Sequence, residues 1–140
     1  MLNSLAPAAA TIDQQHVEVV ACCDELLDVI ARESPVAEVA RIRLRLAGLL
    51  HANLALEESE IMGPLRRLPL DQRPRDFPNV VDEAASLRAR YSEHVGAWNL
   101  TTIAEDPKGY GRDASSLIRQ MKSHLRRKQL AFPDWKKALA

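Results

Sequence analysis

The chain has 140 residues, 46% of them apolar and 27% charged, a composition typical of one globular domain with a sizeable core. Its 19 basic and 19 acidic residues cancel, so bulk charge gives no attraction to nucleic acid or to an anionic membrane surface. We therefore expect a single domain over residues 1–140, with neither a nucleic-acid partner nor a membrane.

Two further features of the sequence predict a cytoplasmic protein. No stretch reaches the roughly 18 uninterrupted apolar residues of a membrane helix, and the N-terminal segment does not look like a signal peptide. Cys22 and Cys23 are neighbours in a helical pattern, where their side chains point about 100° apart and are poorly placed to pair with each other. Such cysteines build no disulfide framework, which suits a reducing compartment.

The first half of the chain contains two stretches with apolar residues at helical spacing. The first covers residues 11–33 and follows an expected flexible tail at residues 1–10. The second covers residues 35–62, and we expect it to start at Pro35 because proline suits the first helical position. Four prolines within residues 64–78 then predict a connection without regular structure.

The second half repeats this pattern. A third helical stretch covers residues 79–105, and after a turn with proline and glycine a fourth covers residues 113–137, where Pro133 is expected to bend or interrupt the last turns. Gly48 and Gly96 fall inside helices, and we expect close backbone packing at both. Four amphipathic helices without a strand candidate predict an all-α, antiparallel, up-down-up-down four-helix bundle.

Three histidines lie one per helix on the apolar faces: His16, His94 and His124. Burying an imidazole without a partner costs on the order of a few kcal/mol, so a shared partner such as a metal ion would explain all three. Helical phase adds three further polar residues to the same layer, namely Asn53, Glu57 and Lys128. Facing helices of a bundle can build a metal site from inward histidines and carboxylates.

This order of residues resembles the hemerythrin-like (HHE) family, and the resemblance covers nearly the whole chain. The family has a His on helix one, His-x3-Glu on helix two, a His on helix three and His-x3-Glu on helix four. The matching pieces here are Asp-Gln-Gln-His16, then Asn53-Leu-Ala-Leu-Glu57-Glu58 leading to Gly-Pro64, then Glu-His94, and His124-Leu-Arg-Arg-Lys128 leading to Phe-Pro133. The resemblance implies a hemerythrin-like bundle whose metal ligands are His16, Glu57, His94 and His124, with His51 and Glu58 as further candidates.

The chain departs from the family pattern at two of these places. Asn53 stands where the histidine paired with Glu57 would be, and choosing His51 instead leaves Ala55 at the carboxylate position. On the fourth helix Lys128 or Gln129 replaces the carboxylate. Family members hold two irons through bridging carboxylates, so the departures imply a degenerate site with one iron rather than two, or none.

Two functions follow from these residues. In the first, His94, His124 and Glu57 form a two-histidine, one-carboxylate set that suits ferrous iron, with His16 as a fourth ligand, in a protein that senses O2, NO or redox state. In the second, the bundle is metal-free and acts as a regulatory or protein-interaction module. Because an ammonium has no lone pair for a metal, Lys128 would then pair with Glu57 in place of the ion.

The remaining expectations concern partners and chemistry. A small diatomic ligand or a protein is the expected partner, and Tyr91 could donate a hydrogen bond into the polar layer. No nucleophile triad, phosphate-binding glycine loop or zinc finger is recognisable. We therefore expect a protein that is not an enzyme.

Overall fold

The computed structural model describes the backbone of residues 2–140 and the side chains from residue 7 onward. Over these residues every regular element is helical and none is a strand, so the all-α prediction is confirmed. In chain order the elements are α1 (Leu2–Ala31), α2 (Val36–Glu57), the π-helical turn η1 (Glu58–Met62), α3 (Gly63–Arg67), the 3-10 turn η2 (Leu70–Gln72), α4 (Phe77–Ala97), α5 (Leu100–Glu105) and α6 (Pro107–Leu139).

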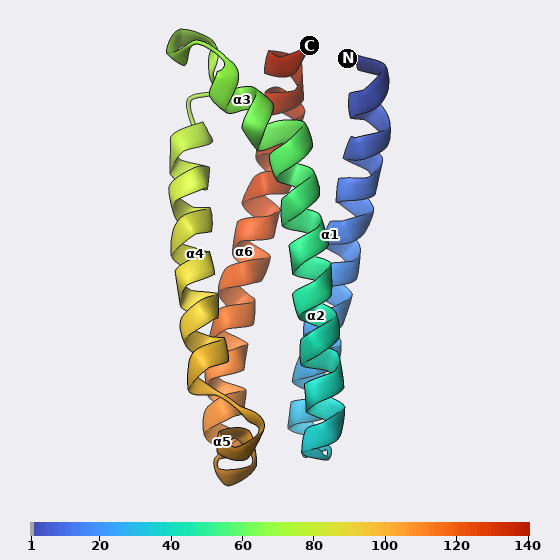
Figure 1. Cartoon of the computed structure of the whole chain (residues 1–140), viewed down its shortest axis with the longest axis vertical. Helices are drawn as coiled ribbons and strands as arrows, with labels where there is room; N and C mark the ends of the chain where they lie inside the picture. Colours follow the sequence, from blue (N-terminus) through green and yellow to red (C-terminus); the bar gives the residue numbers. More distant parts are fainter. Residues whose placement is uncertain (1) are drawn as a thin grey trace.

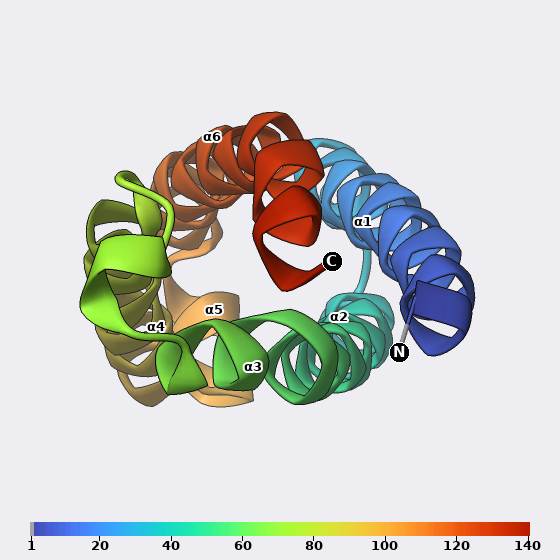
Figure 2. The same ribbon diagram turned by 90° about the horizontal axis from the view of Figure 1, so that it is seen from above.

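Four long helices, α1, α2, α4 and α6, lie along one another, and both ends of the chain lie at the same end of the molecule (Figure 1). Seen from above, the four helices surround a common interior (Figure 2). Backbones approach closely between α1 and α2, between α1 and α6 and between α4 and α6, whereas α2 and α4 scarcely approach each other. Among the described helices none combines the length and the apolar content needed to cross a bilayer.

The buried apolar side chains form two clusters along the long axis. The larger one surrounds Val19, Ile42 and Met121, and the smaller one surrounds Ile61 and Trp135. Most of the buried polar side chains lie where the two clusters meet. The polar residues are thus held inside a packed core rather than on its surface.

The N-terminal helix is longer than the sequence led us to expect. Helix α1 begins at Leu2, so residues 2–10 have a helical backbone in place of the expected tail, and residue 1 lies outside the described residues. Three consecutive alanines at 8–10 favour this extension because alanine has the highest helix propensity. Helix α2 begins directly after Pro35, which occupies the N-cap position instead of the first helical position.

A π-helical turn follows Glu57 directly, where the sequence predicted a continuous helix to residue 62. Pro64 explains it: a proline in a helix lacks an N–H and its ring clashes with the carbonyl four residues earlier, so the preceding turn widens. Gly63 fits this turn because a Cβ there would lie only 2.8 Å from the Glu58 carbonyl oxygen. The prediction that residues 64–78 lack regular structure is wrong, because α3, η2 and the first residues of α4 fall within them.

The predicted third helix is divided in two. Helix α4 ends at Ala97, Trp98 has extended backbone angles, and Asn99 caps the short helix α5 by accepting a hydrogen bond from the Thr102 N–H at 2.8 Å. Asp106 then caps α6 by accepting from the Gly109 N–H, which starts that helix six residues earlier than expected. Polar caps of this kind satisfy N–H groups that have no partner within the helix.

Helix α6 continues through Pro133 to Leu139, and its last turns lean inward over the other helices (Figure 2). The inward lean agrees with the bend expected at this proline. Trp135, fully buried, packs edge-on against Phe77 and donates a hydrogen bond to Asp76 Oδ1 at 2.8 Å. These contacts fix the end of α6 against the start of α4.

Gly48 and Gly96 do not lie at close backbone contacts. A Cβ built at either position meets nothing within 4 Å, and both residues are exposed. The expectation of close packing there is wrong, because both glycines lie on the outer side of their helices.

Candidate functional site

A carboxylate joins three helices inside the bundle. Glu57, the last residue of α2, is 1% exposed. Its Oε1 accepts a hydrogen bond from the Lys128 ammonium of α6 at 2.7 Å, and its Oε2 lies 2.6 Å from Nε2 of His16 on α1. Both partners are as deeply buried, at 2% and 0%. The three side chains form one ionic network, which we call the Glu57 network.

The Lys128 ammonium compensates the charge of the Glu57 carboxylate. Burial by itself would raise the pKa of Glu57, but the hydrogen bond from His16 and the charge and hydrogen bond of Lys128 outweigh it and hold this pKa below its usual range. An ionised carboxylate only accepts hydrogen bonds, so His16 donates through Nε2. Its Nδ1 is buried and has no partner among the described residues. One ammonium therefore neutralises one carboxylate beside a hydrogen-bonded imidazole.

Asn53 lies one turn before Glu57 on α2 and is also buried. Its amide Nδ2 donates to Gln15 Oε1 on α1 at 3.0 Å. Asn53 thus satisfies its own polar group by joining α1 and α2, and it makes no hydrogen bond to the Glu57 network. Gln15 precedes His16, so the two helices share polar contacts on two successive turns.

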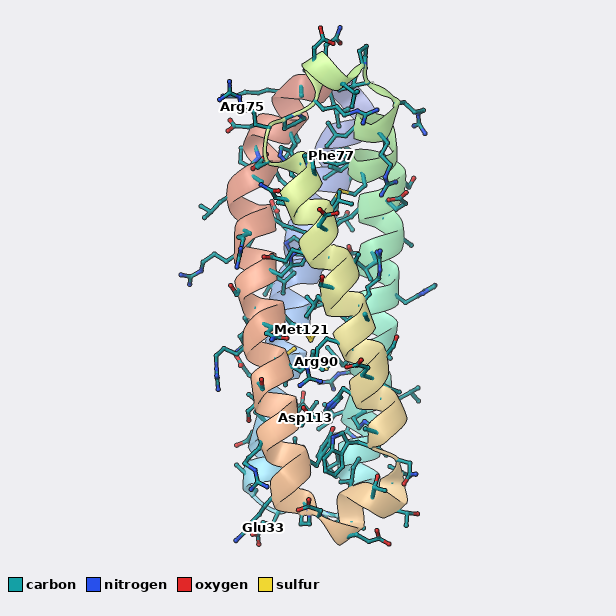
Figure 3. The ribbon with its side chains drawn as sticks, turned by 90° about the vertical axis from the view of Figure 1, so that its left-hand side faces the viewer. Glu33, Arg75, Phe77, Arg90, Asp113 and Met121 are labelled. Carbon is teal, nitrogen blue, oxygen red and sulfur yellow. The ribbon has the colours of Figure 1, made fainter. Side chains whose placement is uncertain are left out.

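His94, near the C-terminal end of α4, belongs to a different polar cluster. Its Nδ1 lies 2.6 Å from Asp113 Oδ2 on α6, and Trp98 Nε1 donates to the same oxygen at 2.9 Å. Arg90 binds the other oxygen, and Figure 3 shows Arg90 and Asp113 between α4 and α6. The His94 ring stacks on Tyr110, with ring centroids 5.5 Å apart.

The pKa values of Asp113 and His94 in this second cluster are both lowered. Burial alone would raise the pKa of Asp113, but hydrogen bonds from His94, Arg90 and Trp98 lower it to about 2. Burial also lowers the pKa of His94, and hydrogen bonding to Asp113 offsets only part of this effect. At neutral pH the cluster therefore contains a neutral imidazole beside a carboxylate and a guanidinium.

His124 has a carboxylate partner of its own. Its Nδ1 lies 2.6 Å from Glu83 Oε1 on α4, and Arg127 pairs with the other oxygen of Glu83 at 2.7 Å. Burial lowers the pKa of His124, and the neighbouring Lys128 charge lowers it further, against the opposing effect of Glu83. A lysine one turn away thus favours the neutral imidazole.

The three histidines are consequently divided among three carboxylates: Glu57, Asp113 and Glu83. Sequence reasoning missed two of these, Glu83 and Asp113. Each lies one helical turn before a residue of the apolar stripe: Glu83 before Leu87, and Asp113 before Leu117. That spacing is the signal that could have found them. Both were missed because they are only partly buried, at the seam between α4 and α6.

The further candidates do not join the polar layer. His51 is exposed on α2, and Glu58 is exposed and paired with Arg66. Tyr91 is half-buried against the larger apolar cluster, and burial raises the pKa of its hydroxyl. No hydrogen bond joins Tyr91 to the other side chains that the structure describes.

The residues present do not fit the iron centre that the family resemblance implies. His16, Glu57, His94 and His124 do not meet at one point, and in the described part of the chain no three His, Cys, Asp or Glu side chains are grouped to hold a metal ion. The Lys128 ammonium binds Glu57 directly and would repel a cation there. We therefore derive no chemistry through a metal.

A groove opens along the seam where α2 and α4 fail to pack. It consists of three hollows: a lower one of about 330 Å³, a middle one of about 280 Å³ and an upper one, beside α3, of about 350 Å³. The first two share Ala47, Tyr91 and Met121, and the last two share residues that include Arg88 and Lys128, so the hollows are continuous. Helix α3 lies near one end of this seam and α5 near the other (Figures 1 and 2).

Comparisons with protein-family models, with curated proteins and with solved structures give no match to this chain.

Proposed function

We propose that the protein is a metal-free, hemerythrin-like four-helix bundle that acts as a regulatory or interaction module and not as an enzyme. The observation that carries this proposal is the contact of 2.7 Å between Lys128 Nζ and Glu57 Oε1. It supplies the positive charge that a bound metal would otherwise provide to the buried carboxylate. A buried ion pair is tolerable when its remaining groups are hydrogen-bonded, and His16 contributes such a bond.

The assignment to an antiparallel, up-down-up-down bundle is part of the proposal. It is supported by the four long helices lying along one another, by the short connection at residues 32–35 between α1 and α2 and by chain ends at the same end of the molecule. The order of polar residues, with His16 on α1, Glu57 on α2, His94 on α4 and His124 on α6, supports the hemerythrin-like kind.

A cytoplasmic location completes the proposal. Cys22 and Cys23 are both buried free thiols, and burial raises the pKa of Cys23 to about 12. Buried thiols act as small apolar side chains, which suits a compartment where cysteines stay reduced.

Elemental analysis tests the metal-free assignment. Protein expressed in iron-supplemented medium and purified without chelator should contain less than about a tenth of an iron, manganese or zinc atom per chain. A chelator should leave its melting temperature unchanged, because a metal that binds only the folded state would stabilise it. Metal near one atom per chain, together with a chelator-dependent loss of stability, would establish the iron-binding alternative instead.

A further inference from the structure

We propose that the groove between α2 and α4 binds a single-chain amphipathic monocarboxylate, with its carboxylate at Lys128 and Arg88 and its apolar chain along the seam. The inference gives the proposed interaction module a ligand class. It rests on that proposed function in one respect: the Lys128 ammonium must have no metal ion beside it.

The Lys128 ammonium has more N–H donors than its contact with Glu57 uses. An ammonium carries three N–H donors, and among the side chains that the structure describes Glu57 alone accepts from Lys128. Lys128 is 2% exposed and lines both the middle and the upper hollow, which places it at the floor of the groove. A buried ammonium with unused donors favours an anionic group that can accept from it.

Arg88 supplies a second cation at the lip of the groove. It is exposed on α4 and lines the same two hollows as Lys128. The two acidic residues of the upper hollow are already paired, Glu57 with Lys128 and Glu58 with Arg66, whereas Arg88 has no ion pair among the side chains that the structure describes. The upper end of the groove thus carries an unneutralised guanidinium, which binds a carboxylate well.

The rest of the groove is mostly apolar, and the two polar side chains that line its lower hollow, Arg43 and His94, bind the Trp98 carbonyl oxygen and Asp113. Its walls and floor over the middle and lower hollows include Leu50, Leu87, Tyr91, Met121 and Leu117. Lys128 and Leu117 are eleven residues apart on α6, which corresponds to about 16 Å of helix. A groove of this length, with the unpaired Arg88 at its upper end and mostly apolar walls beyond, complements one extended medium-length alkyl chain with an anionic head.

Titration calorimetry with dodecanoate tests the proposal. We expect one dodecanoate per chain and no measurable binding of dodecyltrimethylammonium, which has the same alkyl chain and the opposite charge. Arg88→Gln should weaken dodecanoate binding about tenfold, because it removes a charge-assisted hydrogen bond. Arg126→Gln, an exposed change on α6 outside the groove, should leave it unchanged.

A second variant tests the position of the alkyl chain. Ala84 lines the middle and upper hollows and is half-buried, so Ala84→Phe should fill the seam and abolish binding while circular dichroism shows a folded helical protein. Absence of dodecanoate binding, equal binding of the cationic analogue, or full binding by either Arg88→Gln or Ala84→Phe would overturn the proposal. A dimer by sedimentation that dodecanoate does not dissociate would also overturn it, since a second copy would then occupy the groove.

Metal content measured on the same samples separates this inference from the proposed function. Metal-free protein that does not bind dodecanoate contradicts only the groove proposal. Metal-loaded protein contradicts the proposed function, and it removes the basis for using Lys128 as the carboxylate partner.

Discussion

Lys128 Nζ on α6 and Glu57 Oε1 on α2 lie 2.7 Å apart, and both side chains are almost completely buried. Removing two charges from water costs several kcal/mol for each ion, so neither residue is tolerable there without the other. The two residues are 71 positions apart in the sequence, and their contact connects α2 with α6. This contact therefore makes the stability of the core depend on an ionic interaction.

Removing one partner of this pair should be costly. We expect Lys128→Met to lower the free energy of unfolding by about 3–5 kcal/mol, because Glu57 is left as an uncompensated buried charge. The double variant Lys128→Met/Glu57→Gln should recover most of the loss, since no buried charge remains and His16 keeps a polar neighbour. Urea denaturation followed by circular dichroism measures both.

Lys122→Met is the matched control, because Lys122 also lies on α6 but pairs with Asp24 near the surface. Its loss should cost no more than about 1 kcal/mol. A cost at Lys128 as small as at Lys122 would mean that the Lys128 charge reaches solvent.

Placing a carboxylate at position 128 of α6 should make the folded chain bind metal. In Lys128→Glu two carboxylates face each other beside His16, with His124 one turn away, so the metal-free variant should be less stable than the native chain. Added ferrous iron or zinc should raise its melting temperature and its metal content. Arg126→Glu, which makes the same change at an exposed position of α6, should show neither effect. Equal metal uptake by the two variants would contradict the degenerate-site interpretation.

His94 and His124 should make the free energy of unfolding decrease as the pH falls. The pKa values of His94 and His124 are lowered in the folded state, chiefly by burial, so the unfolded chain binds more protons as the pH falls below about 6.5. Their contribution is fully present above that pH and is lost as the pH falls through the folded-state values. The free energy of unfolding, measured between pH 7.5 and 5 in urea, should decrease, and His94→Gln should decrease the slope. An unchanged slope would mean that His94 titrates normally.

Asp113 should stabilise the folded protein at neutral pH and lose this effect in strong acid. Its folded pKa of about 2 lies below the ordinary value of about 3.9, so its stabilising effect is present above the ordinary value and is lost as the pH falls toward 2. Asp113→Asn should therefore make the free energy of unfolding decrease less steeply as the pH falls from about 4 toward 2. If the pH dependence is unchanged in Asp113→Asn, other carboxylates account for the loss of stability in acid.

Two glycines should respond in opposite ways to the same change. Gly48→Ala should stabilise the protein by about 0.5–1 kcal/mol, because the helix gains propensity and the new Cβ meets no neighbour within 4 Å. Gly63→Ala should destabilise it, because its Cβ would lie 2.8 Å from the Glu58 carbonyl oxygen in the π-helical turn. Melting temperatures of the two variants decide this, and a stabilising Gly63→Ala would contradict the structure of that turn.

The sequence alone predicted which polar residues are buried. His16, Asn53, Glu57, His94, His124 and Lys128 are all 5% exposed or less, as their positions on the apolar faces indicate. Helical periodicity is a local property with a fixed angle per residue, so an apolar stripe gives the inward direction without knowledge of the neighbours. The all-α class follows from the same periodicity. The breaks at Trp98 and after Glu57 were missed, since they depend on single caps and on Pro64.

Only the tertiary structure decided which of these residues meet. A stripe gives no information on the axial level or the rotation of one helix relative to another, and these follow from packing over the whole interior. They place His94 beside Asp113 and His124 beside Glu83, so that the imidazoles lie apart instead of around one centre. They also leave α2 and α4 unpacked, which opens the groove above Lys128.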